Sequence, residues 1–251
     1  MALSKIFKKY IRPFIPFPKR NTISRLFPSF EIKNIAYLIH KYKIDTIIDI
    51  GANQGQFVEG IRSAKYLGKI ISFEPLPIEH AIISKKSQKD KNWSIAPRMA
   101  LGEKPGTVEL KITKDTSLSS VNSTLDSSLL VRTENVRIES LDNAIKPYIS
   151  SKSKLLLKID VQGFEPQVLA GATKILKQAQ ALILEVGLIP LYENELPYLE
   201  LLTWLRKKGF HAVYFSPVMK KQKLGEAYQL DAFLVKNPPK KYVKWNTNLL
   251  K

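Results

Sequence analysis

The stretch DTIIDIGANQG at residues 45–55 joins a short run of β-branched apolar residues to a glycine-rich turn. Glycines directly after a strand let a ligand approach the backbone closely, as they do in nucleotide-binding turns. The spacing is Gly51-x-x-x-Gly55 rather than the G-x-G-x-x-G of dinucleotide enzymes, and Asp49 precedes the first glycine. A carboxylate adds little to a turn that binds an anion, whereas it suits a ligand that carries positive charge. The stretch therefore favours an α/β domain with a cationic ligand.

The chain on both sides of this turn repeats a rhythm of short apolar runs and amphipathic segments. Runs that are apolar on both faces are typical of parallel strands covered by helices on both sides. We expect strands at residues 45–50, 69–73, 93–100, 154–159, 181–184, 211–215 and 231–235. We expect helices at residues 31–42, 54–67, 77–89, 165–178 and 195–208. The pattern predicts a Rossmann-like α/β domain.

Two segments depart from this rhythm. Residues 107–113 indicate an added strand, and residues 116–133 are rich in Ser and Thr. A long polar segment of this kind predicts a mobile surface loop. We favour a solvated insertion there over a lid on the substrate.

The four most clearly predicted strands each have an acidic residue at or next to their carboxyl end. These residues are Asp49, Glu74, Asp160 and Glu185. In open α/β sheets, ligands bind outside the carboxyl ends of the strands. A buried carboxylate is costly unless it is paired or solvated, so four at equivalent places favour a cationic or hydroxyl-rich ligand. Glu74 lies 23 residues beyond Gly51, where an acid holds ribose hydroxyls. Together with the glycine turn, this spacing indicates an adenosyl ligand.

The block KIDVQGFE at residues 158–165 follows the fourth of these strands. With DIGANQG at 49–55 and FEPLP at 73–77, it closely resembles the FkbM family of S-adenosylmethionine-dependent methyltransferases. The resemblance runs in one order from residue 44 to about residue 236. It implies a class I methyltransferase fold, with a seven-stranded, mostly parallel sheet whose last strand is antiparallel. It also implies S-adenosylmethionine as cofactor and O-methylation, in known members often of sugar or natural-product hydroxyls.

The resemblance assigns cofactor-binding roles by matched position. Gly51, Asn53 and Gly55 would hold the methionine end of the cofactor, helped by Asp49. Glu74 would hold the ribose.

Three acids are candidates for the chemistry of methyl transfer. By the same match, Asp160 would lie beside the transferable methyl group. A neutral alcohol is a poor nucleophile, and a positioned base typically adds about 10²–10⁴-fold in rate. Asp160 is the first candidate for that base, and Glu185 and Glu165 are the next candidates. The alternative is that Asp160 only orients the cofactor. These acids could hold a divalent cation, but we expect no metal.

Composition divides the chain into three parts. The net charge is +18, yet residues 1–27 carry seven basic residues without an acid, and residues 236–251 carry five more. We expect a basic aromatic extension at 1–30, a methyltransferase domain at 31–236 and a basic tail at 237–251. The absence of cysteine excludes disulfides, thiolate metal sites and a cysteine nucleophile, and it is compatible with a cytoplasmic location.

Several partners and functions compete with this interpretation. The expected partner is a small-molecule or glycan acceptor. An RNA-directed methyltransferase is an alternative, since the isoelectric point is near 9.8, but the body shows no aromatic-interleaved RNA motif. Two further alternatives are a non-catalytic S-adenosylmethionine-binding module and a nicotinamide-dependent dehydrogenase. The presence of Asp49 before the glycine turn disfavours the dehydrogenase. The segment LSKIFKKYI at residues 3–11 is amphipathic. Residues 1–27 could therefore contact an anionic membrane surface peripherally. The alternative is that the apolar face of the segment packs on the domain.

Overall fold

The computed structural model describes residues 30–220 and 227–238. The amphipathic segment expected at residues 3–11 and most of the basic C-terminal tail lie outside these described residues. Within them, no helix is both long enough and apolar enough to cross a membrane.

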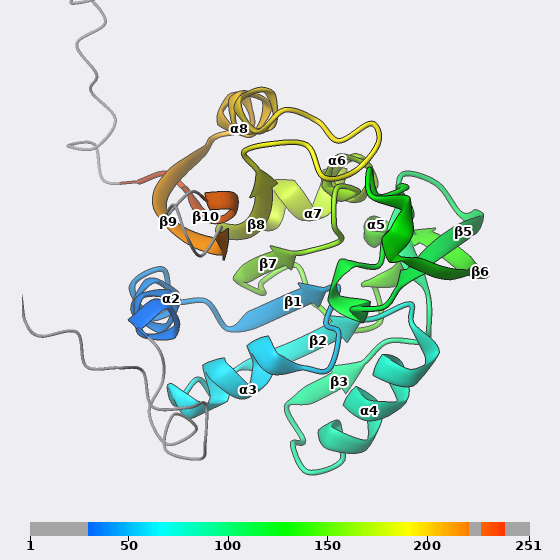
Figure 1. The fold of residues 1–251 in the computed structure, drawn as a ribbon. Coiled ribbons are helices and arrows are strands. Elements are labelled where there is room, and N and C mark those ends of the chain that lie inside the picture. The colour runs from blue at the N-terminus through cyan, green and yellow to red at the C-terminus, as the bar shows by residue number, and fades with distance from the viewer. Residues whose placement is uncertain (1–29, 221–226, 239–251) are drawn as a thin grey trace, which may run out of the picture.

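A seven-stranded sheet forms the centre of the molecule (Figure 1). Its strands are β1 (Thr46–Ile50), β2 (Lys69–Phe73), β3 (Trp93–Ile95), β7 (Leu155–Ile159), β8 (Ala181–Gly187), β9 (Phe210–Lys220) and β10 (Ala227–Lys236). The strand order is β3-β2-β1-β7-β8-β10-β9. Strands β3, β2, β1, β7 and β8 run parallel to one another, and β10 is antiparallel to both of its neighbours. The predicted mostly parallel sheet with an antiparallel last strand is confirmed.

Helices cover both faces of this sheet (Figure 1). One face packs against α2 (Phe30–Lys41), α3 (Gln56–Ser63) and α4 (Pro77–Ser87). The other packs against α5 (Leu141–Ala144), α6 (Glu165–Ala170), α7 (Thr173–Gln178) and α8 (Tyr198–Lys207). Strand β1 is buried throughout, with Ile47 toward the first face and Ile48 toward the second. Burial on both faces explains why its sequence is almost continuously apolar.

Two of the expected helices differ from the prediction because glycines interrupt them. The helix expected from residue 54 begins only at Gln56, because Gly55 before it has a left-handed φ of 85°. The helix expected over 165–178 divides at Gly171, where an added Cβ would lie 1.9 Å from the carbonyl oxygen of Gly102. Close backbone approach therefore requires a glycine at the position where α6 ends.

A second, three-stranded sheet lies beside the first and corrects two predictions. Its order is β4 (Ala100–Gly102), β6 (Leu130–Ser140) and β5 (Gly106–Thr113). The strand expected at 93–100 is two strands, β3 and β4, in different sheets. The loop expected at 116–133 is too long, since β6 begins at Leu130, and the part before it contains the 3₁₀ turns η2 (Thr116–Leu118) and η3 (Ser127–Leu129). The first half of β6 is exposed on both faces, so its sequence lacks the apolar alternation that marks a half-buried strand.

Candidate active site

The turn between β1 and α3 is compact because three of its residues have positive φ. The values are 77° for Gly51, 46° for Asn53 and 85° for Gly55. A Cβ on Gly51 would lie 1.9 Å from the carbonyl oxygen of Asp160, so only glycine allows the turn to contact the end of β7. The glycine turn and the first of the candidate catalytic residues are thereby brought together.

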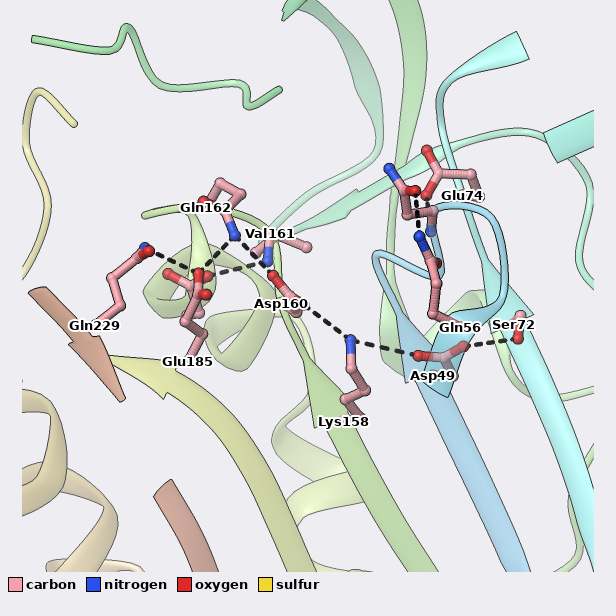
Figure 2. A network of polar contacts seen from close by, with 12 residues as sticks. Asp49, Gln56, Ser72, Glu74, Lys158, Asp160, Val161, Gln162, Glu185 and Gln229 are labelled. Atoms are coloured by element: carbon pink, nitrogen blue, oxygen red, sulfur yellow. Dashed lines mark hydrogen bonds and ion pairs between the residues drawn. The ribbon is translucent and has the colours of Figure 1, made fainter. Parts of the chain in front are cut away.

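Glu74 follows β2 and is buried beside this turn (Figure 2). Its Oε2 accepts a hydrogen bond from the backbone N–H of Asn53 at 2.6 Å, and its Oε1 accepts one from the N–H of Leu76 at 2.9 Å. Burial raises the pKa of Glu74 to about 7, although these two hydrogen bonds lower it. The carboxyl group therefore has a fixed orientation at the carboxyl end of β2.

Asp49 lies beneath the turn, inside the sheet. It is fully buried and does not line the cavity described below. Its Oδ2 accepts a hydrogen bond from Ser72 Oγ at 3.0 Å, whereas its Oδ1 has no hydrogen-bond partner and lies 3.6 Å from Lys158 Nζ. Burial raises the pKa of Asp49, and the charge of Lys158 partly offsets that rise.

Lys158 connects this buried acid to the end of β7, and sequence reasoning missed its role. Its Nζ lies 3.1 Å from Asp160 Oδ2, between that carboxylate and Asp49 (Figure 2). Burial lowers the pKa of Lys158, but the nearby Asp160, Asp49 and Asp231 raise it more, so that the ammonium group stays charged. A single charge in the apolar run LLLKI was the available signal, because such a residue needs a partner in a neighbouring strand.

Gln162 joins the two leading catalytic candidates. Its Nε2 donates to Asp160 Oδ1 at 2.8 Å and to Glu185 Oε2 at 2.6 Å (Figure 2). A second amide, that of Gln229, donates to the same Glu185 oxygen at 3.0 Å. Burial, together with the charges of Asp160 and Glu165, raises the pKa of Glu185 well above its usual range. The structure thus places Asp160 and Glu185 side by side at the ends of β7 and β8.

Glu165, the third candidate, has a different position. It is buried, does not line the cavity, and accepts a hydrogen bond from the N–H of Val161 at 3.0 Å. Burial raises its pKa to about 8. Its observed contact supports the loop after β7. Among the described residues, no group of three or more His, Cys, Asp or Glu side chains is arranged to hold a metal ion.

A cavity of about 270 Å³ opens at the carboxyl ends of these strands. Its described lining includes Gly51, Asn53, Glu74, Asp160 and Glu185, and it contains no Lys, Arg or His. Apolar side chains from the β3–β4 region and from β5 form much of the remaining wall. An acidic cavity without a basic residue suits a cationic ligand and opposes a phosphate-bearing one.

The Ser- and Thr-rich segment forms part of this wall, which corrects its interpretation as a solvated insertion. Five of its residues line the cavity: Thr116, Ser117, Leu118, Ser120 and Val121. Ser120 Oγ donates to the carbonyl oxygen of Gln162 at 2.7 Å, and Tyr192 Oη donates to that of Leu118 at 3.1 Å. Sequence reasoning missed Tyr192 altogether, since a lone tyrosine in a loop carries no positional signal.

The sheet order and the acidic cavity at its carboxyl ends define a Rossmann-like enzyme of the class I methyltransferase type. Residues 49–212 match the methyltransferase FkbM domain, which is more than half of the chain, and the chain therefore belongs to this family. Its domain is that of an S-adenosylmethionine-dependent methyltransferase, as the resemblance in its sequence implied.

Solved methyltransferase structures are similar to this chain, and the first of them supports the fold. The methyltransferase FkbM from Methylobacillus flagellatus KT superposes with a TM-score of 0.52 at 12% identity, covering 76% of this chain and 43% of that one. The chain thus spans less than half the length of that protein. Magnesium protoporphyrin IX methyltransferase from Synechocystis PCC 6803, solved with bound S-adenosylmethionine, gives 0.44 at 10% identity, covering 82% and 78%. Precorrin-6y C5,15-methyltransferase from Geobacter metallireducens GS-15 gives 0.45 at 10%, covering 86% and 94%. No curated protein sequence matches the chain.

Proposed function

We propose that this methyltransferase acts on a hydroxyl group of a sugar, glycan or natural product, and that Asp160 accepts the proton of that hydroxyl. The observation that carries the proposal is the placement of the Asp160 carboxylate. It lines the cavity with its side chain 33% exposed, while Lys158 and Gln162 each hold one of its oxygens. A carboxylate that is held in place and partly open to the cavity is well placed to act as a base.

The residues around the cavity fit S-adenosylmethionine. The cofactor carries a sulfonium and an ammonium group, and the described lining holds three acids and no basic residue. Glu74 would accept hydrogen bonds from the ribose hydroxyls, while Gly51 and Asn53 would present backbone to the methionine end. Asp49 is buried and does not line the cavity, so it would support the turn that holds the cofactor rather than contact the cofactor itself. When bound, the cofactor supplies an electrophilic methyl group.

The role of the chain is then to orient the acceptor and remove one proton. Orientation of two reactants can supply about 7–11 kcal/mol of a barrier. A hydroxyl in the cavity would donate a hydrogen bond to Asp160 and transfer its proton as the oxygen forms its new bond. Glu165, which holds the loop after β7, acts as a positioning residue in this proposal.

The Asp160→Asn variant tests the proposal, with Glu74→Ala and Asp90→Asn for comparison. Calorimetry measures S-adenosylmethionine affinity, and mass spectrometry measures methyl transfer to a panel of sugars, small alcohols and amines. Asp160→Asn should lower the rate on the order of 10²-fold or more with little change in affinity. Glu74→Ala should instead weaken affinity by about 1–3 kcal/mol. Asp90, a surface partner of Arg62, should change neither.

A large loss of affinity in Asp160→Asn, with turnover intact at saturating cofactor, would make Asp160 a cofactor ligand and contradict its role as the base. Methylation of amines without any alcohol in the panel would contradict the choice of oxygen.

A further inference from the structure

The edge of the main sheet where β1, β2, β3, β7, β8 and β9 begin lies opposite the cavity and is strongly basic. The loops that lead into β1, β2, β3, β7 and β9, counted to the first residue of each strand, carry nine lysines and two acids, Asp45 and Asp90. All nine lysines are exposed, and within the described residues none forms an ion pair. We call this surface the basic edge; its lysines are Lys43, Lys65, Lys69, Lys89, Lys91, Lys146, Lys152, Lys154 and Lys208.

The two acids of the basic edge are already occupied. Asp90 pairs with Arg62 at 2.7 Å. The Asp45 carboxylate accepts hydrogen bonds from the Thr46 hydroxyl at 2.7 Å and from the N–H of Lys154 at 3.0 Å. The lysine charges are therefore not neutralised by their own loops, and the surface attracts an anionic partner.

The edge that holds the cavity has the opposite charge. The loops that follow β1, β2, β3, β7 and β8 carry one basic residue, Arg98, which pairs with Glu134 at 2.7 Å. They carry four acids, which are Glu74, Asp160, Glu193 and Glu195. The two edges are separated by the length of β1, whose five residues span about 16 Å. An anion bound at the basic edge therefore lies outside the cavity and is not the group that is methylated.

Hydrogen bonds join the loops of the basic edge into one surface. The N–H of Lys69 donates to the carbonyl oxygen of Asp45 at 3.0 Å, and the N–H of Asp45 donates to that of Lys154 at 3.1 Å. The Gln178 amide donates to the carbonyl oxygens of Ser150 and Ser153 at 2.7 and 2.9 Å. A fixed backbone thus presents the lysines together, which lowers the cost of ordering them against an extended anionic partner.

One apolar side chain stands among these lysines. Leu67, between Lys65 and Lys69 in the sequence, is 75% exposed, the highest value for a large apolar residue in the described part of the chain. Its loop is held in place, because the carbonyl oxygen of Leu67 accepts from the Asn92 amide at 3.0 Å. Arg62 donates to the carbonyl oxygens on either side of it at 2.7 and 2.9 Å. The leucine is therefore presented to solvent by a rigid loop.

A groove beside Leu67 combines positive charge with apolar surface. Lys41, Lys43 and Lys65 line it together with the apolar side chains of Ile39 and Ile44, and its described lining contains no acid. Cationic side chains next to apolar ones fit the interface of an anionic membrane, where phosphate groups lie next to hydrocarbon.

The chain also leaves the described structure at this edge. The N–H of Lys236, the last residue of β10, donates to the carbonyl oxygen of Gln180 at 2.8 Å, directly before β8 begins. Beyond residue 238 the sequence carries four more lysines and no acid. Four further positive charges are therefore attached to the chain at the basic edge.

We propose that the basic edge docks on an anionic membrane surface. Its lysines lie against phospholipid headgroups, Leu67 enters the boundary between headgroups and acyl chains, and the cavity faces the water. Each lysine near such a surface increases the affinity by about 5-fold. This inference concerns a surface outside the cavity and does not depend on which group is methylated.

A nucleic acid is the other common polyanion, and it fits this surface less well. As a substrate it would have to reach the cavity at the opposite edge. Proteins that bind single strands stack bases on aromatic side chains, whereas Tyr66 and Tyr148 of these loops are half-buried and the exposed side chain is Leu67. The loops contain no arginine, the residue best suited to nucleic-acid recognition.

Co-sedimentation of the full-length protein with vesicles tests the proposal. One set of vesicles contains phosphatidylcholine alone, and the other contains equal parts of phosphatidylcholine and phosphatidylglycerol. We expect binding to the mixed vesicles only, and loss of that binding at about 1 M NaCl, where the screening length is about 3 Å. Fluorescence anisotropy with single-stranded and duplex RNA of mixed sequence measures the competing interaction.

Charge reversal then assigns the binding to the basic edge. The double variant Lys43→Glu with Lys65→Glu should lower the partition coefficient on mixed vesicles by about 25-fold or more. The control is Lys104→Glu with Lys114→Glu, two exposed lysines beside the second sheet, which changes the net charge equally and should lower binding by less than about 3-fold. Circular dichroism and S-adenosylmethionine affinity check that both variants are folded.

A fluorescent label tests the orientation on the membrane. The chain contains no cysteine, so a single introduced cysteine is labelled selectively. An environment-sensitive fluorophore at Leu67→Cys should shift to the blue on mixed vesicles. The same fluorophore at Leu199→Cys should not shift, because Leu199 is also exposed, at 62%, but begins α8 on the side of the cavity.

Four results would overturn the proposal. The first is the absence of binding to mixed vesicles at low salt. The second is an equal loss of binding in the two charge-reversal variants, which would trace the attraction to net charge or to residues 1–27. The third is a blue shift at Leu199→Cys without one at Leu67→Cys. The fourth is RNA binding that Lys43→Glu with Lys65→Glu abolishes while vesicles are not bound, which would assign the basic edge to a nucleic acid.

Discussion

Lys158 is the next-to-last residue of β7, and its ammonium group lies between the carboxylates of Asp49 and Asp160. Burial of a charge is tolerated when partners and hydrogen bonds compensate for the lost hydration. Asp49 is fully buried and depends on this cation, because its Oδ1 has no hydrogen-bond partner. At the residue scale, the carboxylates of Asp49 and Asp160 therefore depend on the ammonium group of Lys158 to compensate for their burial.

We predict that Lys158→Met lowers the free energy of unfolding by about 3–5 kcal/mol, because it leaves a buried acid without its partner. Urea denaturation followed by circular dichroism measures the change. Arg137→Met is the control, since it removes an exposed ion pair with Glu139 that contributes at most about 1 kcal/mol. Equal losses in the two variants would show that Lys158 is not needed to compensate Asp49.

At the scale of elements, the segment from Thr116 to Leu125 is attached to two loops at the carboxyl ends of the sheet. Ser120 Oγ and the Asn122 side chain donate to backbone carbonyls of the loop after β7, at 2.7 and 2.8 Å. The N–H of Leu125 donates to the carbonyl oxygen of Leu191 in the loop after β8 at 2.9 Å. These contacts, rather than its own composition, hold the segment in the cavity wall.

Removing one of these side-chain hydrogen bonds should therefore loosen the segment locally. We predict that Ser120→Ala raises amide hydrogen exchange over residues 116–125 by about 5-fold, as expected for a bond of about 1 kcal/mol. Mass spectrometry of exchanged peptides measures this, with β1 as an internal reference. Ser128→Ala is the control, because its hydroxyl bonds only to the nearby Asp126. Unchanged exchange in Ser120→Ala would mean that backbone pairing alone holds the segment.

At the scale of the whole molecule, the buried acids make stability depend on pH. Burial raises the pKa of Glu74 and Asp231 to about 7 and that of Glu165 to about 8. The folded protein keeps these protons at pH values where the unfolded chain has released them. Each acid therefore contributes stability that is fully present below its ordinary pKa and is lost as the pH rises through its folded value.

We predict that Glu165→Gln becomes more stable relative to the wild type as the pH rises from about 5 to about 8. The substituted amide stays neutral, so it avoids the cost of ionising a buried group, and its oxygen can still accept from Val161. Urea denaturation at several pH values measures the difference in the free energy of unfolding. Glu109→Gln, at an exposed position of β5, is the control and should give a difference independent of pH. A pH-independent difference for Glu165→Gln as well would contradict the raised pKa.

Much of the fold could be predicted because it depends on local patterns. The apolar runs of β1, β2, β7 and β8 mark buried parallel strands, and Gly51 and Gly55 mark the turn after the first of them. The family resemblance supplied the mostly parallel sheet with its antiparallel last strand, and the cofactor. The sequence also indicated which acids end the strands, since their positions follow from where each apolar run stops.

Only the tertiary structure decided how these residues combine. The pairing of Asp49 with Lys158 depends on β1 lying next to β7 in a particular register. The bridge from Gln162 to Asp160 and Glu185 depends on a left-handed residue held by a tyrosine from another loop. Contacts of this kind join residues far apart in the chain, so no local period or spacing records them. The same reason explains why the Ser- and Thr-rich segment has the composition of a surface loop and yet forms a wall of the cavity.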